Sequence, residues 1–119
     1  MERKIKMVKR TISELIAFSP PGHYGMTAMV YHGKEETGAE KFRVGIDTFI
    51  PGGGIEWDDG SPQEKLYYVI EGEITVIDKD GKKYIIGKDE SLTILPGVGR
   101  SVVNESNYPV RMLVIANYV

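Results

Sequence analysis

Glycine and proline residues cut the chain into short apolar runs, and this punctuation constrains the fold more than any other feature. The 119 residues include 14 glycines and six prolines. The runs between them are rich in valine, isoleucine, tyrosine and phenylalanine, and turn signals recur at intervals of about eight to twelve residues. This rhythm is typical of all-β proteins, and it predicts about eight or nine short strands in a sandwich or barrel.

The predicted strands run from near the N-terminus to the end of the chain. They cover residues 4–8, 26–31, 42–50, 65–71, 74–77, 83–86, 91–95, 101–104 and 110–116. Asp78-Lys79-Asp80-Gly81 contains Asp-Gly, a strong hairpin signal because glycine accepts a positive φ, and the polar stretch 33–40 also suits a hairpin. Pro51-Gly52-Gly53-Gly54 is expected to break the chain sharply. The pattern alone predicts an all-β antiparallel barrel or jelly roll.

The N-terminal segment has a different texture. Thr11-Ile-Ser-Glu14 has the form of a capping box, in which a hydroxyl and a carboxylate satisfy the free amides of a first helical turn. The predicted helix has a turn or two, because Ser19-Pro20-Pro21-Gly22 stops anything longer. The length fits one domain over residues 1–119, with an arm and short helix over 1–22 and a β-barrel over 23–119.

Composition and charge argue against several classes of function. The formal net charge of −2 gives no indication of a nucleic-acid or membrane partner. Residues 3–10 are basic, but no apolar stretch long enough for a secretion signal or membrane span follows them. The absence of cysteine excludes disulfides and thiolate metal sites. We therefore expect a cytoplasmic protein without a nucleic-acid or membrane partner.

Two segments resemble the two motifs of the cupin family. Residues 51–73 run from a Pro-Gly-Gly turn to the ending Tyr-Val-Ile-Glu-Gly-Glu, and residues 89–104 pass through the turn at Pro96-Gly97 to Asn104. The order and the short separation of the two segments are those of small microbial cupins. The resemblance implies a small single-domain cupin, a jelly-roll barrel of the double-stranded β-helix type.

The same resemblance locates four positions that hold a divalent metal in cupins, normally three histidines and a glutamate. Counting within the motifs, these positions are occupied by Asp58, Gly60, Lys65 and Arg100. Lysine and arginine are poor ligands, because neither offers a free lone pair at neutral pH, and two cations would repel a divalent ion. We therefore predict a variant that lacks the family metal and has no cofactor.

The register of one strand decides which side chains face inward. A slip of one residue reverses the two faces of a strand. The Gly72 anchor favours Lys65 on the inside, whereas a bulge before the strand would turn Glu64 inward, together with Asp59 and Ser61. That alternative leaves a carboxylate-rich pocket better suited to Mg²⁺ or Ca²⁺.

Convergence of Asp58, Lys65 and Arg100 would form a site for a small organic anion such as a carboxylate, enolate or sugar acid. A lysine beside an arginine inside a barrel loses part of its preference for the charged form and can act as a general base, while Arg100 stabilises the anion formed. The corresponding hypothesis is a metal-independent isomerase, lyase or cyclase, with these three residues as candidate catalytic groups. The alternative is a solvent-facing Lys65 and a structural ion pair of Arg100.

Four further residues are candidate ligand-binding groups. Tyr67 shares the parity of Lys65, so we expect it to line the pocket, whereas Tyr68 faces the opposite side. Trp57, the only tryptophan, can stack on a ligand near the barrel mouth, although packing at a dimer interface or over the core edge is the more common role. Glu56 and Glu64 complete the set; for Glu56, exposed surface is the stronger alternative.

The two histidines, His23 and His32, have no metal-ligand spacing and are expected in a loop and at a strand end. A site built from either of them with Glu56, Asp58 or Glu64 remains a minority alternative.

Two further functions remain open: a non-catalytic module that binds a small molecule, and a barrel kept for dimerisation. We expect a small-molecule ligand and a homodimer formed through residues 4–8 and 110–119, with exchange of the N-terminal arm as a further possibility.

Overall fold

The structure of the protein is a computed structural model, which describes residues 6–119. Eight strands form almost all of its regular structure: β1 (His23–His32), β2 (Phe42–Asp58), β3 (Lys65–Glu71), β4 (Glu73–Ile77), β5 (Lys83–Gly87), β6 (Ser91–Ile94), β7 (Arg100–Val103) and β8 (Val110–Asn117). A short 3₁₀ helix, η1 (Ile12–Glu14), and a one-turn helix, α1 (Lys34–Thr37), complete the set. The all-β prediction is confirmed.

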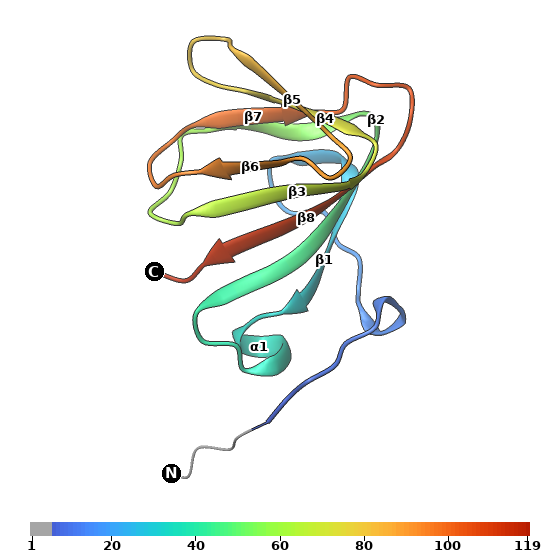
Figure 1. Cartoon of the computed structure of the whole chain (residues 1–119), viewed down its shortest axis with the longest axis vertical. Coiled ribbons are helices and arrows are strands. Elements are labelled where there is room, and N and C mark those ends of the chain that lie inside the picture. Colours follow the sequence, from blue (N-terminus) through green and yellow to red (C-terminus); the bar gives the residue numbers. More distant parts are fainter. Residues whose placement is uncertain (1–5) are drawn as a thin grey trace.

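The strands form a single antiparallel sheet that curls into a nearly closed barrel (Figure 1). Its order is β5-β4-β7-β2-β8-β3-β6, with β1 added beside β2. The N-terminal arm runs away from one end of the barrel, and α1 lies at the same end (Figure 1). No helix among residues 6–119 is long and apolar enough to cross a membrane.

The strand β2 differs most from its prediction. It continues through Pro51-Gly52-Gly53-Gly54 to Asp58 instead of breaking there. Gly52 N–H donates to the Asn104 carbonyl, and Asn104 N–H donates to the Gly53 carbonyl, each at 2.8 Å. A Cβ on Gly54 would collide with the Val102 carbonyl. The glycines therefore allow neighbouring strands to approach closely, a use of glycine that resembles a turn signal in sequence.

The N-terminal predictions have mixed outcomes. The capping box is present, because Thr11 N–H donates to Glu14 Oε1 at 3.2 Å at the start of η1. The predicted strand Lys4–Val8 is not formed over residues 6–8, and its first part lies outside the described residues. The predicted hairpin around residues 33–40 is confirmed by the antiparallel pairing of β1 with β2, and its connection contains α1.

The barrel interior holds the hydrophobic core at one end and polar side chains at the other. Along β8, Val110 and Met112 are fully buried, and Val114 and Ala116 continue the same face toward the polar end. The remaining core residues come from all parts of the barrel: Met26, Ala28, Phe49, Ile55, Tyr67, Val69, Ile74, Val76, Ile86, Ile94 and Val102.

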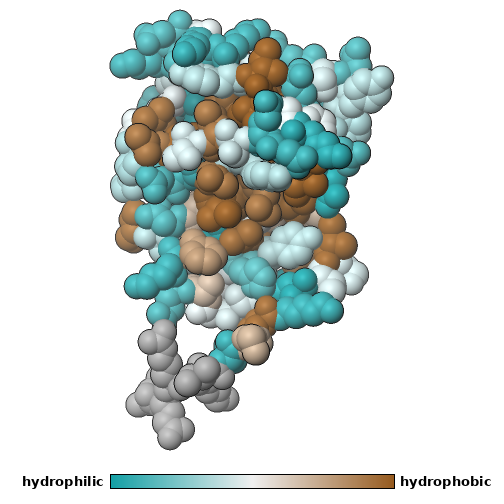
Figure 2. Space-filling view, in the orientation of Figure 1, coloured by the Kyte–Doolittle hydropathy of each residue, from teal (hydrophilic) through white to brown (hydrophobic). Residues whose placement is uncertain are grey.

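The outer face of β3 and β8 is apolar. Leu66 lies opposite Ile115, and Tyr68 lies opposite Leu113. In Figure 2, hydrophobic side chains gather over the middle of this side of the molecule. Because β8 pairs with β2 on one edge and β3 on the other, residues 110–117 offer no free edge for the expected strand pairing of two copies. Homodimerisation remains a prediction.

Candidate functional site

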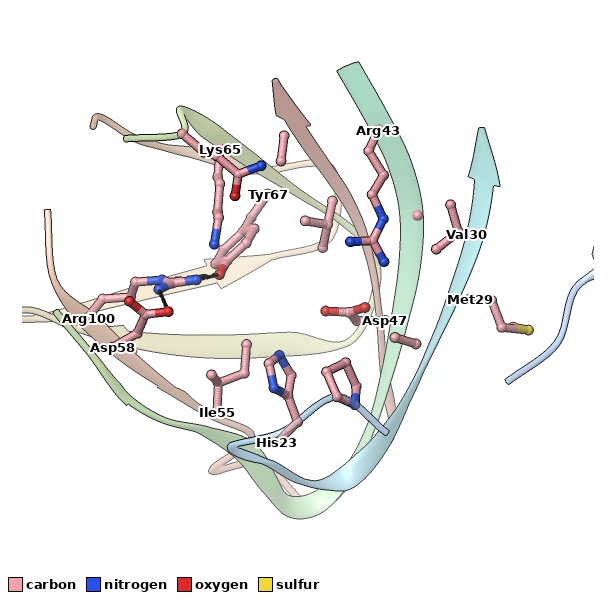
Figure 3. A pocket seen from close by; sticks show the side chains of 16 residues that line it. His23, Met29, Val30, Arg43, Asp47, Ile55, Asp58, Lys65, Tyr67 and Arg100 are labelled. Carbon is pink, nitrogen blue, oxygen red and sulfur yellow. Dashed lines mark hydrogen bonds and ion pairs between the residues drawn. The ribbon is translucent and has the colours of Figure 1, made fainter. Parts of the chain in front are cut away.

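A cavity of about 200 Å³, with several charged and polar side chains among its apolar wall residues, occupies the open end of the barrel. Figure 3 shows its charged and polar side chains converging from β1, β2, β3 and β7. It contains the cations Arg43, Lys65 and Arg100 and the acids Asp47 and Asp58. The other lining residues are Pro20, His23, Ala28, Met29, Val30, Gly45, Ile55, Gln63, Tyr67, Val114 and Ala116.

Arg100 is the centre of a hydrogen-bonded network at one side of the cavity. It is the first residue of β7 and is 5% exposed. Its Nε and Nη2 donate to the Tyr67 hydroxyl at 3.3 and 2.8 Å, and its Nη1 lies 3.1 Å from Asp58 Oδ2. The buried cation is therefore compensated by an ion pair and hydrogen bonds, as a buried charge requires.

Tyr67 is almost fully buried and faces the cavity with its hydroxyl. Burial raises the pKa of this hydroxyl, although the nearby Arg100 acts in the opposite direction. The oxygen accepts both hydrogen bonds from Arg100 and keeps its own proton, which a ligand oxygen can accept. Tyr67 is thus a fixed donor in the wall of the cavity.

Asp58 reaches the cavity because β2 is irregular near its end. The pairing of β2 with β7 shifts register between Ile55 and Asp58, so both residues line the cavity although they are three apart. Asp58 Oδ1 accepts the Gly60 N–H at 2.8 Å. This hydrogen bond, followed by the charge of Arg100, holds the pKa of Asp58 below its ordinary value against the effect of desolvation. Asp58 is therefore an ionised carboxylate at neutral pH.

Gly60 contributes no side chain and has no space for one. Its φ is +98°, and a Cβ would lie 2.7 Å from the Gly97 carbonyl carbon. A histidine at this position would require the neighbouring loop to move.

Lys65 lies at the start of β3, opposite Ala116 of β8 and Ile94 of β6. It lines the cavity, whereas Glu64 is exposed and lies outside the lining. Desolvation, followed by the charge of Arg100, lowers the pKa of Lys65. Within residues 6–119, no hydrogen bond or ion pair holds its ammonium group, so this cation is available to a ligand.

Asp47 and Arg43 were not among the predicted site residues. Both belong to β2 and share the inward face with Phe49, which is fully buried. Desolvation raises the pKa of Asp47 to about 6, although Arg43 and Lys65 act to lower it. The parity with Phe49 is the sequence signal that locates them, since residues two and four apart on a strand share a face.

His23 also lines the cavity, at the start of β1. Its ring points toward the space between Asp47 and Ile55 (Figure 3). His32, in contrast, lies at the end of β1, with Nδ1 3.4 Å from the Thr37 hydroxyl. His23 and Asp58 thus line the same cavity, but residues 6–119 contain no group of three metal-ligating side chains of the kind that the sequence-based alternative requires.

Three predicted ligand-binding residues lie outside the cavity lining. Trp57 is 48% exposed, and its Nε1 donates to Asp59 Oδ1 at 2.7 Å. Glu56 and Glu64 are also exposed. Of the predicted residues, the structure therefore brings together Asp58, Lys65, Tyr67 and Arg100.

Comparison with known protein families and solved structures shows which family the chain belongs to. A family model described as "Cupin domain" matches residues 45–116, more than half of the sequence. The chain belongs to the cupin family. Among solved structures, a polyketide cyclase from Streptomyces resistomycificus has a TM-score of 0.81 at 24% identity, over 93% of this chain and 80% of that one. A predicted oxalate decarboxylase from Thermotoga maritima has a TM-score of 0.78 at 21% identity, over 95% and 100%. Both likenesses support the fold alone.

A curated relative is closer in sequence. The chain is 29% identical over 102 residues to a β-D-galactosidase of Mycobacterium tuberculosis, and the match covers 86% of each protein.

The cupin metal does not fit the residues at the four motif positions. Asp58 is already ion-paired with Arg100 and accepts a hydrogen bond from the Gly60 N–H, and Gly60 supplies no side chain. Lys65 and Arg100 bring positive charge where the metal would lie. Within residues 6–119, no three histidine, cysteine or acidic side chains are grouped so that they could hold an ion. The donor set therefore argues against a divalent metal at this place.

Proposed function

We propose that this cupin binds a small organic anion in the barrel cavity and transforms it by acid–base catalysis without a bound metal. The reaction class is isomerisation, elimination or cyclisation of the type that begins with removal of a proton from a carbon next to a carboxylate or carbonyl group. One observation carries the proposal: Asp47, a carboxyl with a pKa of about 6, lines the same cavity as Lys65 and the network of Arg100.

The balance of charge supports an anionic ligand. Asp58 neutralises Arg100 by direct ion pairing, which leaves Lys65 as a cation without a hydrogen-bond or ion-pair partner among the described residues. The Tyr67 hydroxyl adds a hydrogen-bond donor to the same wall. A carboxylate or enolate oxygen placed there meets one charge and one donor, an arrangement that stabilises negative charge.

Asp47 is suited to carry the proton. At neutral pH it is mostly ionised and can accept a proton, and its conjugate acid is accessible within about one pH unit. Lys65, the base of the sequence-based hypothesis, also has a lowered pKa. We assign the base role to Asp47 and the binding of the anion to Lys65. Substitution of each residue distinguishes the two assignments.

The test is hydrogen–deuterium exchange followed by proton NMR. Protein treated with EDTA is incubated in D₂O with pyruvate and D-galacturonate, and the carbon-bound protons next to the carboxyl or carbonyl groups are monitored. We expect exchange faster than in buffer, and a loss of about 100-fold or more in Asp47→Asn. Asp80→Asn, an exposed aspartate in the β4–β5 hairpin, is the matched control and should exchange as the unmodified protein does.

Three results would overturn parts of the proposal. Full exchange activity in Asp47→Asn would remove Asp47 from the base role, and loss in Lys65→Met alone would return that role to Lys65. Exchange that appears only after a divalent metal is added would contradict the metal-independent mechanism. Tight binding of both acids without exchange would favour a non-catalytic binding module.

Hydrolysis of a β-galactoside is a second candidate function. The pKa of Asp47 is raised and that of Asp58 is lowered, and such a split pair provides the acid and the carboxylate partner that glycoside hydrolysis requires. The relative from Mycobacterium tuberculosis is named a β-D-galactosidase. Release of p-nitrophenol from p-nitrophenyl β-D-galactopyranoside, abolished in both Asp47→Asn and Asp58→Asn, would support this function. No release above buffer would exclude it for this substrate.

A further inference from the structure

His23 is held rigidly at the cavity. Its backbone N–H donates to the Pro20 carbonyl at 3.1 Å, and the preceding Gly22 carbonyl accepts the Glu56 N–H at 2.8 Å. His23 also pairs with Ile55 across β1 and β2. The Pro20-Pro21 sequence limits backbone freedom immediately before it. The backbone of His23 is therefore fixed from both sides of the turn.

The orientation of the ring fixes its tautomer. Nδ1 lies 2.9 Å from the Pro21 carbonyl oxygen, which can only accept a hydrogen bond. Nδ1 therefore carries the proton, and in the neutral ring Nε2 carries the lone pair. No hydrogen bond of Nε2 is recorded among residues 6–119, and the ring lies in the cavity (Figure 3). Nε2 is thus a preorganised acceptor without a partner in the described part of the chain.

The cavity has two chemically different sides. Lys65 and the Tyr67 hydroxyl, held by Arg100, lie on one side and offer positive charge and a donor. His23 and Asp47 lie across the cavity from them and offer acceptors, with the cation Arg43 near Asp47 on the same side (Figure 3). A carboxylate matches the first side, and hydroxyl groups, which donate hydrogen bonds, match the second.

We propose that the ligand is a hydroxylated carboxylic acid the size of a single sugar acid, whose carboxylate contacts Lys65 and Tyr67 and one of whose hydroxyl groups donates to His23 Nε2. The inference rests on the proposed function, which concerns the anionic group of the ligand, and adds hydroxyl groups at the other end of the ligand. The cavity of about 200 Å³ is smaller than the roughly 300–1,000 Å³ of sites for drug-sized ligands, so one ring fits and a chain of sugars does not.

Three probes of similar size separate the two halves of the ligand. D-Galacturonate has a carboxylate and hydroxyl groups, D-galactose has hydroxyl groups without the carboxylate, and cyclohexanecarboxylate has the carboxylate on a ring without hydroxyl groups. Calorimetry measures the dissociation constant of each. We expect D-galacturonate to bind at least about tenfold more tightly than either of the others, because each lacks one set of contacts.

The variant His23→Phe removes the acceptor and keeps an aromatic ring. It should weaken D-galacturonate binding by roughly five- to tenfold and leave cyclohexanecarboxylate unchanged. His32→Phe is the matched control, since His32 is the other histidine of the sequence and lies outside the cavity lining. The nitrogen NMR spectrum adds a readout independent of affinity: D-galacturonate should shift Nε2 of His23 and leave the signals of His32 in place.

The outcomes distinguish this inference from the proposed function. The protein could bind D-galacturonate and cyclohexanecarboxylate equally well, with the same affinities in His23→Phe. That result would overturn the proposed recognition of ligand hydroxyl groups and leave anion binding intact. The protein could instead bind D-galacturonate and D-galactose equally well and lose affinity for both in His23→Phe. That result would overturn the proposed recognition of the carboxylate, while His23 would remain the acceptor for hydroxyl groups. Failure of all three probes to bind would overturn both.

Discussion

The hydroxyl of Tyr67 accepts two hydrogen bonds from one side chain, since Arg100 donates to it from Nε at 3.3 Å and from Nη2 at 2.8 Å. The cupin motif has a metal-binding histidine at the position of Arg100. In this protein the Arg100 side chain instead forms hydrogen bonds with Tyr67 in the barrel wall. The phenolic proton is then left for a ligand, so the network converts a metal-ligand position into support for a hydrogen-bond donor.

Removal of the Tyr67 hydroxyl should destabilise the protein. In Tyr67→Phe, two donors of a buried guanidinium lose their acceptor, which costs about 2–3 kcal/mol of unfolding free energy. Urea denaturation monitored by circular dichroism measures the change. Tyr68→Phe is the control on the same strand, because its exposed hydroxyl donates to Asp89 at 2.8 Å and water can replace that partner. Similar losses in both variants would contradict the importance of the buried network.

Asp47→Asn should stabilise the protein at neutral pH. The pKa of Asp47 is about 6 in the folded protein and 3.8 as the reference value, so the folded state binds more protons between these values. Its contribution to stability therefore falls as pH rises from about 4 through about 6. Removal of this carboxylate should raise the unfolding free energy at pH 7 by about 1–3 kcal/mol, after allowance for partial exposure.

For Asp47→Asn, the dependence of stability on pH provides the control. The difference between Asp47→Asn and the unmodified protein should shrink as pH falls from about 7 to 4, where Asp47 is protonated in the folded state. Denaturation midpoints measured across this range give the comparison. A difference that does not vary with pH would show that burial does not perturb Asp47.

Gly60→Ala should cost more stability than an alanine at another left-handed glycine. At Gly60, a Cβ would meet the Gly97 carbonyl carbon at 2.7 Å and the Val98 oxygen at 2.9 Å, which leads us to expect a loss of about 2–4 kcal/mol. Gly81 has a φ of +78° and open space around it, so Gly81→Ala should cost about 1 kcal/mol. Equal losses in urea denaturation would mean that the second histidine position of the motif is not closed by the loop at Gly97.

The sequence predicted the fold well because turn signals and the two motifs are local. It also placed Tyr67 on the inward face with Lys65, since parity along a short regular strand is reliable. Trp57 was expected at the cavity and is not in its lining, because the register shift between Ile55 and Asp58 breaks the alternation. Irregularities of this kind depend on neighbouring strands and leave no clear local signal.

Asp47 and His23 show why the site was only partly predictable. An aspartate in a strand is usually exposed, and the raised pKa of Asp47 comes from desolvation inside the curled barrel, which sequence spacing does not reveal. His23 was expected in a loop. Its role at the cavity depends on the hydrogen bond from Nδ1 to the Pro21 carbonyl. Both positions depend on tertiary structure.

The metal content of the purified protein tests the central claim most directly. That claim is that the place of the cupin metal centre is taken by the side chains of Arg100, Tyr67, Asp58 and Lys65. Protein is purified without chelators, and manganese, iron, nickel, copper and zinc are measured by mass spectrometry against protein concentration. We predict that each metal is far below stoichiometric amounts and does not increase after incubation with metal salts and desalting. About one equivalent of a single transition metal per chain, lost on substitution of Asp58, would contradict the account.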